Sequence, residues 1–251
     1  MLKYLLILPL LVVLFVLLVG AEVLIAKGGP KLEFTNPPSV PAKLGAGTPL
    51  TYVVMGDSTA AGEGASSYKT GIADTTARYL ARNHTVTYVN VAISGARTHD
   101  VLATQVQKAV SYKPDVVLLA IGANDVTHVT SSGSVKKSAQ QIINQLIAAN
   151  CNVKIVLTGS PDMGAVPRLL QPLRWLAGAK TNSLNATFGE LVRDNKLTFA
   201  PIAAKTGSQF RQNHALFAAD HFHPNDQGYA TWMPVLEPAL DAALENQPTH
   251  C

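Results

Sequence analysis

Residues 116–125 read VVLLAIGAND, and this stretch decides the fold. Its first six residues form a continuous apolar run, which predicts a strand buried on both faces of a sheet. A glycine and polar residues follow at once and end the strand. Residues 51–58, TYVVMGDS, have the same form. The two runs indicate a sheet in which polar residues come directly after the carboxyl ends of buried strands.

Outward from these two runs, predicted strands and helices alternate along the chain. Further strands are predicted at residues 86–92, 153–158 and 197–200. Helices are predicted at residues 68–82, 99–112, 134–149, within 168–193 and at 228–244. Strict alternation predicts an α/β domain whose mostly parallel sheet is covered by helices on both faces. Ligands of such domains bind beyond the carboxyl ends of the strands.

The N-terminal segment differs from the rest of the chain. Residues 4–26 are almost continuously apolar, between Lys3 and Lys27, and Glu22 is the only charged residue inside. About 20 apolar residues in a helix cross the hydrocarbon core of a bilayer. The segment is therefore long enough to span a membrane.

Two fates of this segment remain open. A retained segment is a membrane anchor, whereas a cleaved signal peptide has a small-residue site such as Val19-Gly20-Ala21. We therefore assign residues 1–27 to an N-terminal membrane anchor or signal peptide. Either fate puts the rest of the chain on the extracytoplasmic side of the cell membrane, or outside the cell if the segment is cleaved.

Composition separates a spacer from a folded domain. Residues 28–49 are rich in proline and glycine and lack helical or strand periodicity, which predicts a linker. Residues 50–251 are assigned to one folded domain. In the whole chain, 47% of residues are hydrophobic and 14% are charged, which excludes a disordered protein. The net charge of +4 is scattered and forms no basic patch, so we expect no nucleic-acid partner.

The sequence leaves the redox state of the two cysteines open. The chain has only Cys151 and Cys251, and their spacing matches no metal motif. An exported domain could join them in one disulfide, and two free thiols fit the sequence equally well.

Four short motifs follow predicted strands or precede the last predicted helix. They are Gly56-Asp57-Ser58, Ser94-Gly95-Ala96, Gly122-Ala123-Asn124-Asp125 and Asp220-His221-Phe222-His223-Pro224. In this order they resemble the conserved blocks of the SGNH hydrolases, also called GDSL esterases and lipases. The resemblance covers residues 52–229. It implies a three-layer α/β/α fold with a flavodoxin-like central sheet, and a serine esterase that needs neither a metal nor a cofactor.

The resemblance assigns a catalytic triad to Ser58, His223 and Asp220. A serine hydroxyl is a weak nucleophile until a base takes its proton, and His223 is the expected base. Asp220 would accept the other ring N–H of this histidine and fix its orientation. His221 is the nearest rival as the base, but the spacing D-x-x-H of the family selects His223.

The same resemblance supplies an oxyanion hole. Its donors would be the backbone N–H groups of Ser58 and Gly95 and the side-chain amide of Asn124. Asp57 and Asp125 are expected to brace their loops through hydrogen bonds, without contacting the substrate. The glycine-rich segment at residues 60–65 lacks the spacing and lysine of a phosphate-binding loop.

The triad predicts acyl transfer but does not identify the ester. Lipids, lysophospholipids and acetylated glycans are all compatible with a membrane-tethered esterase. Residues 161–176 carry apolar side chains that either line an acyl pocket, lie against lipid or form the buried face of a helix. Two alternative functions remain: an O-acyltransferase acting on envelope glycans, and a catalytically silent envelope-binding module.

Overall fold

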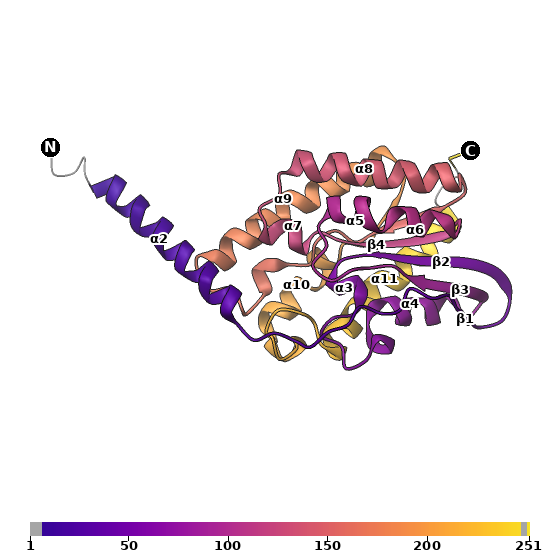
Figure 1. The fold of residues 1–251 in the computed structure, drawn as a ribbon, viewed down its shortest axis with the longest axis horizontal. Coiled ribbons are helices and arrows are strands. Elements are labelled where there is room, and N and C mark those ends of the chain that lie inside the picture. The colour runs from indigo at the N-terminus through magenta and orange to yellow at the C-terminus, as the bar shows by residue number, and fades with distance from the viewer. Residues whose placement is uncertain (1–6, 247–249) are drawn as a thin grey trace.

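A computed structural model describes residues 7–246 and 250–251 of the chain (Figure 1). Its centre is a six-stranded sheet with the strand order β1-β3-β2-β4-β5-β6. The strands are β1 (Ala42–Leu44), β2 (Thr48–Gly56), β3 (His84–Asn90), β4 (Val116–Ala120), β5 (Lys154–Leu157) and β6 (Thr198–Phe199). All neighbours pair in parallel except β1, which runs antiparallel to β3 at one edge.

The five parallel strands have the flavodoxin-like order. The chain passes from β2 to β3 on one side and then returns to place β4 on the other side of β2. The order therefore reverses between β2 and β4, and ligands of open α/β sheets bind at such a switch point. Both strands are buried along their paired length, with Val53 opposite Val117 and Met55 opposite Leu119. The predicted α/β fold with a mostly parallel sheet is confirmed.

Helices cover both faces of the sheet (Figure 1). One face carries α5 (Thr98–Thr104), α6 (Val106–Ser111), α8 (Ser132–Ala149) and α9 (Leu173–Asp194). The other face carries α4 (Ile72–Leu80), α10 (Ile202–Gln212) and α11 (Asp226–Asn246). The short helices α3 (Ser58–Ala61) and α7 (Ala123–Thr127) follow β2 and β4 directly. The described residues also contain the short 3-10 helices η1 (Tyr68–Thr70), η2 (Met163–Ala165) and η3 (His214–Leu216).

Three local differences from the predicted elements have simple causes. The segment predicted as one helix at residues 99–112 is divided into α5 and α6, because Gln105 between them turns its side chain to the backbone of Gly56. The sequence does not predict helix α10, because its sequence is polar and only Ile202, Thr206, Gly207 and Phe210 are buried. The sequence does not predict strand β1, because this strand has only three residues and lies among the prolines and glycines of residues 28–49.

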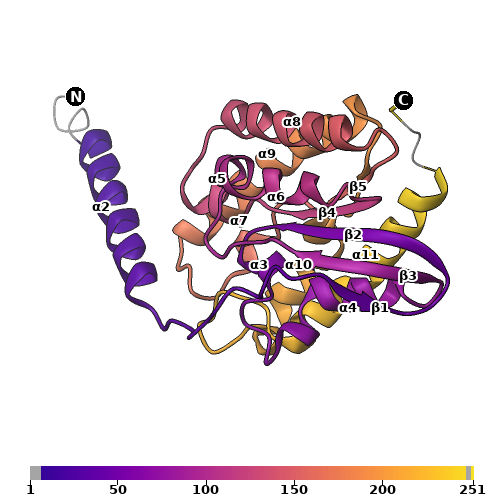
Figure 2. The ribbon, with the colours of Figure 1, turned by 45° about the vertical axis from the view of Figure 1, so that its right-hand side comes forward.

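Helix α2 (Ile7–Gly28) projects from one end of the domain (Figure 2). An 18-residue stretch of it has a mean hydropathy of 2.8, and most of its side chains are exposed. By length and composition it can cross a membrane. Residues 1–6 of the predicted anchor and residues 247–249 of the predicted domain lie outside the described residues.

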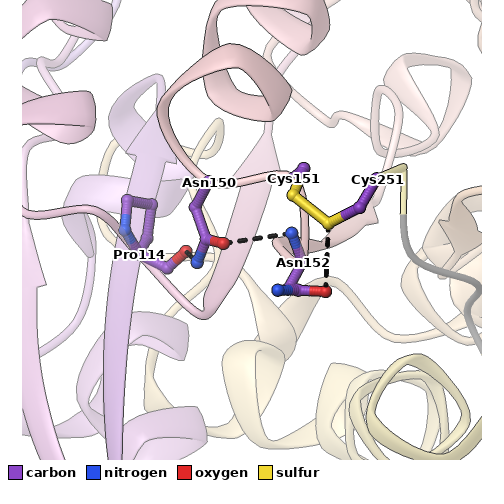
Figure 3. Close-up of a disulfide and its surroundings, with 5 residues drawn as sticks. All are labelled: Pro114, Asn150, Cys151, Asn152 and Cys251. Atoms are coloured by element: carbon purple, nitrogen blue, oxygen red, sulfur yellow. Dashed lines mark hydrogen bonds between the residues drawn. A yellow bond between two sulfur atoms is a disulfide. The ribbon is translucent and has the colours of Figure 1, made fainter.

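Cys151 and Cys251 form a disulfide (Figure 3). Cys151 lies in the turn between α8 and β5, at the amino end of the sheet. Beside it, Asn150 donates a hydrogen bond from its side chain to the carbonyl of Pro114, and its side-chain oxygen accepts one from the backbone of Asn152. The disulfide therefore fastens the C-terminal segment to the end of the sheet where no predicted site residue lies.

Candidate active site

Ser58 lies at the turn between β2 and α3. Asp57 precedes it in an extended conformation and caps α3, because its side chain accepts a hydrogen bond from the backbone N–H of Thr59 at 2.9 Å. This cap makes the chain enter a helix directly at the end of a buried strand. Ser58 is the first residue of α3, so its backbone N–H has no acceptor within the helix. The turn holds both the hydroxyl and the N–H of Ser58 at the carboxyl end of the sheet.

His223 connects Ser58 to Asp220. The distance from His223 Nε2 to Ser58 Oγ is 2.9 Å, and the distance from His223 Nδ1 to Asp220 Oδ2 is 2.6 Å. These are hydrogen-bond distances, although Ser58 and His223 are 165 positions apart in the sequence. The structure therefore brings together the three residues predicted as a triad, in the predicted order.

The Asp220 carboxylate is held by its own loop. Its Oδ1 accepts hydrogen bonds from the backbone N–H groups of Phe222, at 3.0 Å, and His223, at 3.1 Å. Burial acts to raise the pKa of Asp220, but the hydrogen bonds from the ring and backbone of His223 and from Phe222 favour the charged form. Together they hold this pKa below its usual value. Asp220 is therefore a fixed anion beside the histidine ring.

The other two predicted oxyanion donors follow β3 and β4: Gly95 lies in the turn after β3, and Asn124 lies in α7. Gly95 has a φ of +82°, a backbone conformation that residues other than glycine seldom adopt. The side-chain amide of Asn124 donates a hydrogen bond to the carbonyl of Ala96 at 3.1 Å, which joins the two turns. In addition, the Ile93 N–H donates to the carbonyl of Gly56 at 3.2 Å, which ties the turn after β3 to the end of β2.

The two predicted bracing carboxylates make different contacts. Asp125 Oδ2 accepts hydrogen bonds from the backbone and the hydroxyl of Thr98, at 2.9 and 2.7 Å, and so connects α7 to the start of α5. Asp57 also accepts from the hydroxyl of Thr59. Burial raises the pKa of Asp57 above its usual value, although the hydrogen bonds from Thr59 and the charge of His223 oppose the shift.

Glu63 is a residue of the site that the sequence did not single out. Its Oε1 lies 3.8 Å from His223 Nδ1, and its Oε2 accepts a hydrogen bond from the hydroxyl of Ser94. Its backbone carbonyl accepts from the Tyr229 hydroxyl at 2.5 Å. Glu63 is thus a second carboxylate beside His223, and it connects the histidine to the turn that carries Gly95.

The glycine-rich segment after Ser58 has a structural reason. Gly64 has a φ of +93°, and a Cβ there would lie 2.8 Å from the Cβ of His223 and 2.4 Å from the carbonyl oxygen of Pro224. Only glycine lets this segment pack against the histidine loop. The signal for Glu63 in the sequence was therefore its place between glycines, five residues after the predicted nucleophile.

A small apolar cavity of about 30 Å³ adjoins Ser58 and His223. Its walls include Met163, Phe210 and Trp232.

No group of three His, Cys, Asp or Glu side chains with the geometry of a metal site occurs within residues 7–246 and 250–251. Within the same part of the chain, the backbone N–H groups of Ser58 and Gly95 donate no hydrogen bond to a backbone carbonyl.

Known proteins share this chain's sequence pattern and fold. A model of the GDSL-like lipase/acylhydrolase family matches residues 54–231. A GDSL-like esterase of Mycobacterium tuberculosis is 29% identical over 197 residues, which cover 76% of this chain and 62% of that protein. The chain therefore spans less than two thirds of this relative's length.

Two solved structures have the same fold at low sequence identity. A two-domain esterase active on acetylated mannans, crystallised with mannopentaose, has a TM-score of 0.62 and 18% identity, over 82% of this chain and 53% of that one. An extracellular lipase from Streptomyces rimosus has a TM-score of 0.60 and 21% identity, over 77% of this chain and 99% of that one. The two neighbours differ in their described activities, so this likeness concerns the fold alone.

Proposed function

The chain belongs to the GDSL-like lipase/acylhydrolase family, and from this premise we propose that it hydrolyses carboxylic esters by a Ser-His-Asp mechanism. The observation that carries the proposal is the continuous path of hydrogen bonds from Ser58 Oγ through His223 to the Asp220 carboxylate. The same three groups in the same order activate the serine of many hydrolases with unrelated folds.

In the first half of the reaction, Ser58 Oγ attacks the carbonyl carbon of the ester. His223 Nε2 takes the hydroxyl proton and then gives it to the departing alcohol. Asp220 holds the ring with Nδ1 protonated and stabilises the imidazolium that forms. Water then attacks the acyl-enzyme, again with His223 as the base, and releases the carboxylic acid.

The attack moves negative charge onto the carbonyl oxygen. The backbone N–H groups of Ser58 and Gly95 are available for this oxygen. One N–H of the Asn124 amide is occupied by Ala96, and the second completes the set of three donors. Fixed donors of this kind stabilise the transition state because they need no reorganisation as the charge forms.

We further infer that α2 anchors the catalytic domain on the extracytoplasmic side of a membrane. Two observations support this location. Helix α2 has the length and composition of a bilayer span. The disulfide between Cys151 and Cys251 is of the type that persists in oxidising compartments.

The test is hydrolysis of 4-nitrophenyl esters, from acetate to palmitate, by the full chain in detergent. Wild type is expected to hydrolyse at least one of these esters, and Ser58→Ala is expected to lower the rate by about 10⁴-fold or more. Circular dichroism and thermal unfolding check that the variant is folded. Equal rates for the folded variant and wild type on every ester would overturn the proposal.

A further inference from the structure

One face of α2 is docked on the catalytic domain. Glu22 is 4% exposed, although its neighbour Leu24 is 71% exposed. Glu22 Oε2 accepts a hydrogen bond at 2.8 Å from the N–H of Leu173, the first residue of α9. Arg168 donates from Nε to the carbonyl of Ala26, also at 2.8 Å. A carboxylate at a helix N-terminus is favourable, so the only charged residue predicted inside the apolar segment serves to attach α2 to α9.

A large groove follows this attachment. It has a volume of about 880 Å³ and lies between the inward face of α2 and the domain. Val19 and Val23 form the wall on α2, and Leu173 and Leu176 form the wall on α9. Phe222 and His223 also line the groove, so it includes side chains of both the apolar helix and the triad histidine loop. Its volume is in the range of sites that bind an organic ligand.

The groove and the small cavity are adjacent but differ in size. Both are lined by Phe222 and His223, whereas Ser58 lines only the small cavity. The cavity has a volume of about 30 Å³, whereas the groove has a volume of about 880 Å³. The groove has enough volume for an aliphatic chain. The site therefore has one very small and one large apolar compartment.

The proposed mechanism assigns a part of the ester to each compartment. The acyl carbon must bond to Ser58 Oγ, so the acyl group belongs in the cavity beside Ser58. The departing alcohol oxygen must receive the proton of His223, so the alcohol belongs on the side of the groove. This assignment rests on the proposed function, because it uses the catalytic roles of both residues.

The surroundings of the groove indicate where the alcohol comes from. Val129 lines the groove and is 74% exposed, and Leu170 and Trp175, which are 43% and 65% exposed, are chain neighbours of the lining residues Leu169 and Leu176. Tryptophan is enriched at the interface between membrane and water. Lys27, at the end of the apolar span, lines the same groove. With α2 in a bilayer, the groove is therefore open to lipid at the level where the hydrocarbon region ends.

We propose that the groove binds the hydrophobic alcohol part of a short-acyl ester taken from the bilayer that holds α2. Ser58 Oγ bonds to the acyl carbon, the bond from that carbon to the lipid alcohol oxygen breaks, and the alcohol leaves with the proton of His223. Water then releases a short carboxylic acid from Ser58. The enzyme thus removes a short acyl group from a membrane-embedded alcohol.

Two isomeric esters test the orientation. Hexadecyl acetate has a short acyl group on a long alcohol, and ethyl hexadecanoate has a long acyl group on a short alcohol, with the same molecular formula. Each is presented to full-length wild type in phosphatidylcholine vesicles. Hexadecyl acetate is expected to react at least about tenfold faster, because its long chain is on the alcohol and can enter the groove. The long chain of ethyl hexadecanoate is on the acyl group and would have to enter the small cavity. Equal rates, or a faster reaction of ethyl hexadecanoate, would overturn the proposed orientation.

Adjacent positions on α2 test the groove. Val23→Trp fills the groove from α2, whereas Leu24→Trp adds the same ring on the exposed side of the helix. We expect Val23→Trp to lower the ratio of hexadecyl acetate to ethyl acetate hydrolysis by about tenfold, and Leu24→Trp to change it by less than about twofold. Leu176→Trp, from the opposite wall, should repeat the effect of Val23→Trp. Unchanged ratios in both groove variants would contradict the proposal.

Failure of the inference is distinct from failure of the proposed function. Hydrolysis of soluble 4-nitrophenyl acetate that depends on Ser58 reports the triad alone. If that reaction is present and the isomeric esters react equally, only the inference on the lipid alcohol falls. If that reaction is absent or persists in Ser58→Ala, the proposed function falls as well.

Discussion

The two ends of the central sheet are stabilised by different kinds of contacts. At the carboxyl end, Ser58, Gly95 and Asn124 follow β2, β3 and β4 directly, and the site includes carboxylates that are almost fully buried. At the amino end, the turn before β5 carries a disulfide, and ordinary hydrogen bonds hold the neighbouring side chains. One end therefore concentrates polar groups in the protein interior, and the other end contains a covalent cross-link.

This difference indicates which end of the sheet contributes more to activity and which end contributes more to stability. A buried carboxylate with an unpaired oxygen, such as Asp57 Oδ2, is unfavourable for folding unless other contacts compensate. Such groups are tolerated where the chemistry requires a fixed charge or a fixed loop. Substitutions at the carboxyl end should therefore reduce activity far more than stability, and substitutions at the amino end should do the reverse.

Among the substitutions that test this difference between the two ends, Asp220→Asn is expected to have the largest effect. The amide no longer supplies the negative charge that holds the His223 ring and stabilises its protonated form. We expect kcat to fall by about 10³–10⁴-fold, measured with 4-nitrophenyl acetate. The matched control is Asp226→Asn, which alters a carboxylate bound to Ser66 and Thr70 at the start of α11. Loss of activity in the control equal to that in Asp220→Asn would refute a specific role for Asp220.

Asn124→Ala should have the next largest effect. Loss of one oxyanion donor lowers kcat by about 10²–10³-fold in enzymes of this type. KM should change little, because the donor acts mainly on the charged transition state. Steady-state kinetics with the same ester separates the two constants. A rise in KM at constant kcat would show instead that Asn124 contributes to binding or only holds the turn at Ala96.

At the other end of the sheet, Cys251→Ser should reduce stability and leave activity intact. The disulfide closes a loop of 100 residues, and its loss is expected to lower the free energy of unfolding by about 2–4 kcal/mol. Urea unfolding of oxidised wild type and the variant measures this difference. The turnover of 4-nitrophenyl acetate at 25 °C should be unchanged. A variant of equal stability but reduced activity would reverse the assignment of the two ends.

The smallest expected effect concerns acid sensitivity. The pKa of Asp220 is lower in the folded than in the unfolded protein, so its stabilising contribution is present above the unfolded value of about 3.9. That contribution is lost as the pH falls through the lower folded value. The difference in unfolding free energy between wild type and Asp220→Asn should therefore be constant above about pH 5 and shrink below about pH 4.

The disulfide supplies the contrast for this measurement. The difference between wild type and Cys251→Ser should stay constant through the same acid range, because a disulfide does not titrate. If the Asp220→Asn difference were also independent of pH, the hydrogen bonds of the Asp220 carboxylate would not contribute to stability in the way described.

The sequence predicted the sheet and the three triad positions for different reasons. The strands were predictable because buried parallel strands are continuous apolar runs, as residues 116–121 show. Ser58, Asp220 and His223 were identified by their motifs, since neither hydropathy nor spacing reveals that residues 165 positions apart lie in contact. Their roles remain a proposal that kinetics must test.

The features that escaped prediction depend on tertiary contacts. Glu63 is an ordinary loop carboxylate in the sequence, and only the folding of its loop against His223 brings it to the site. Glu22 reads as an isolated charge in an apolar segment, and its partner is a backbone N–H at the start of α9. Strand β1 is only three residues long and forms because β3 offers an open edge.

The most direct test of the central claim is covalent labelling of the full chain by a fluorophosphonate. A triad of Ser58, His223 and Asp220 predicts one phosphonyl group per chain, located on the peptide that contains Ser58 by mass spectrometry. Labelling should disappear in Ser58→Ala and slow strongly in Asp220→Asn. Labelling at another residue, or none in a folded wild-type protein, would contradict the assignment of Ser58 as the nucleophile.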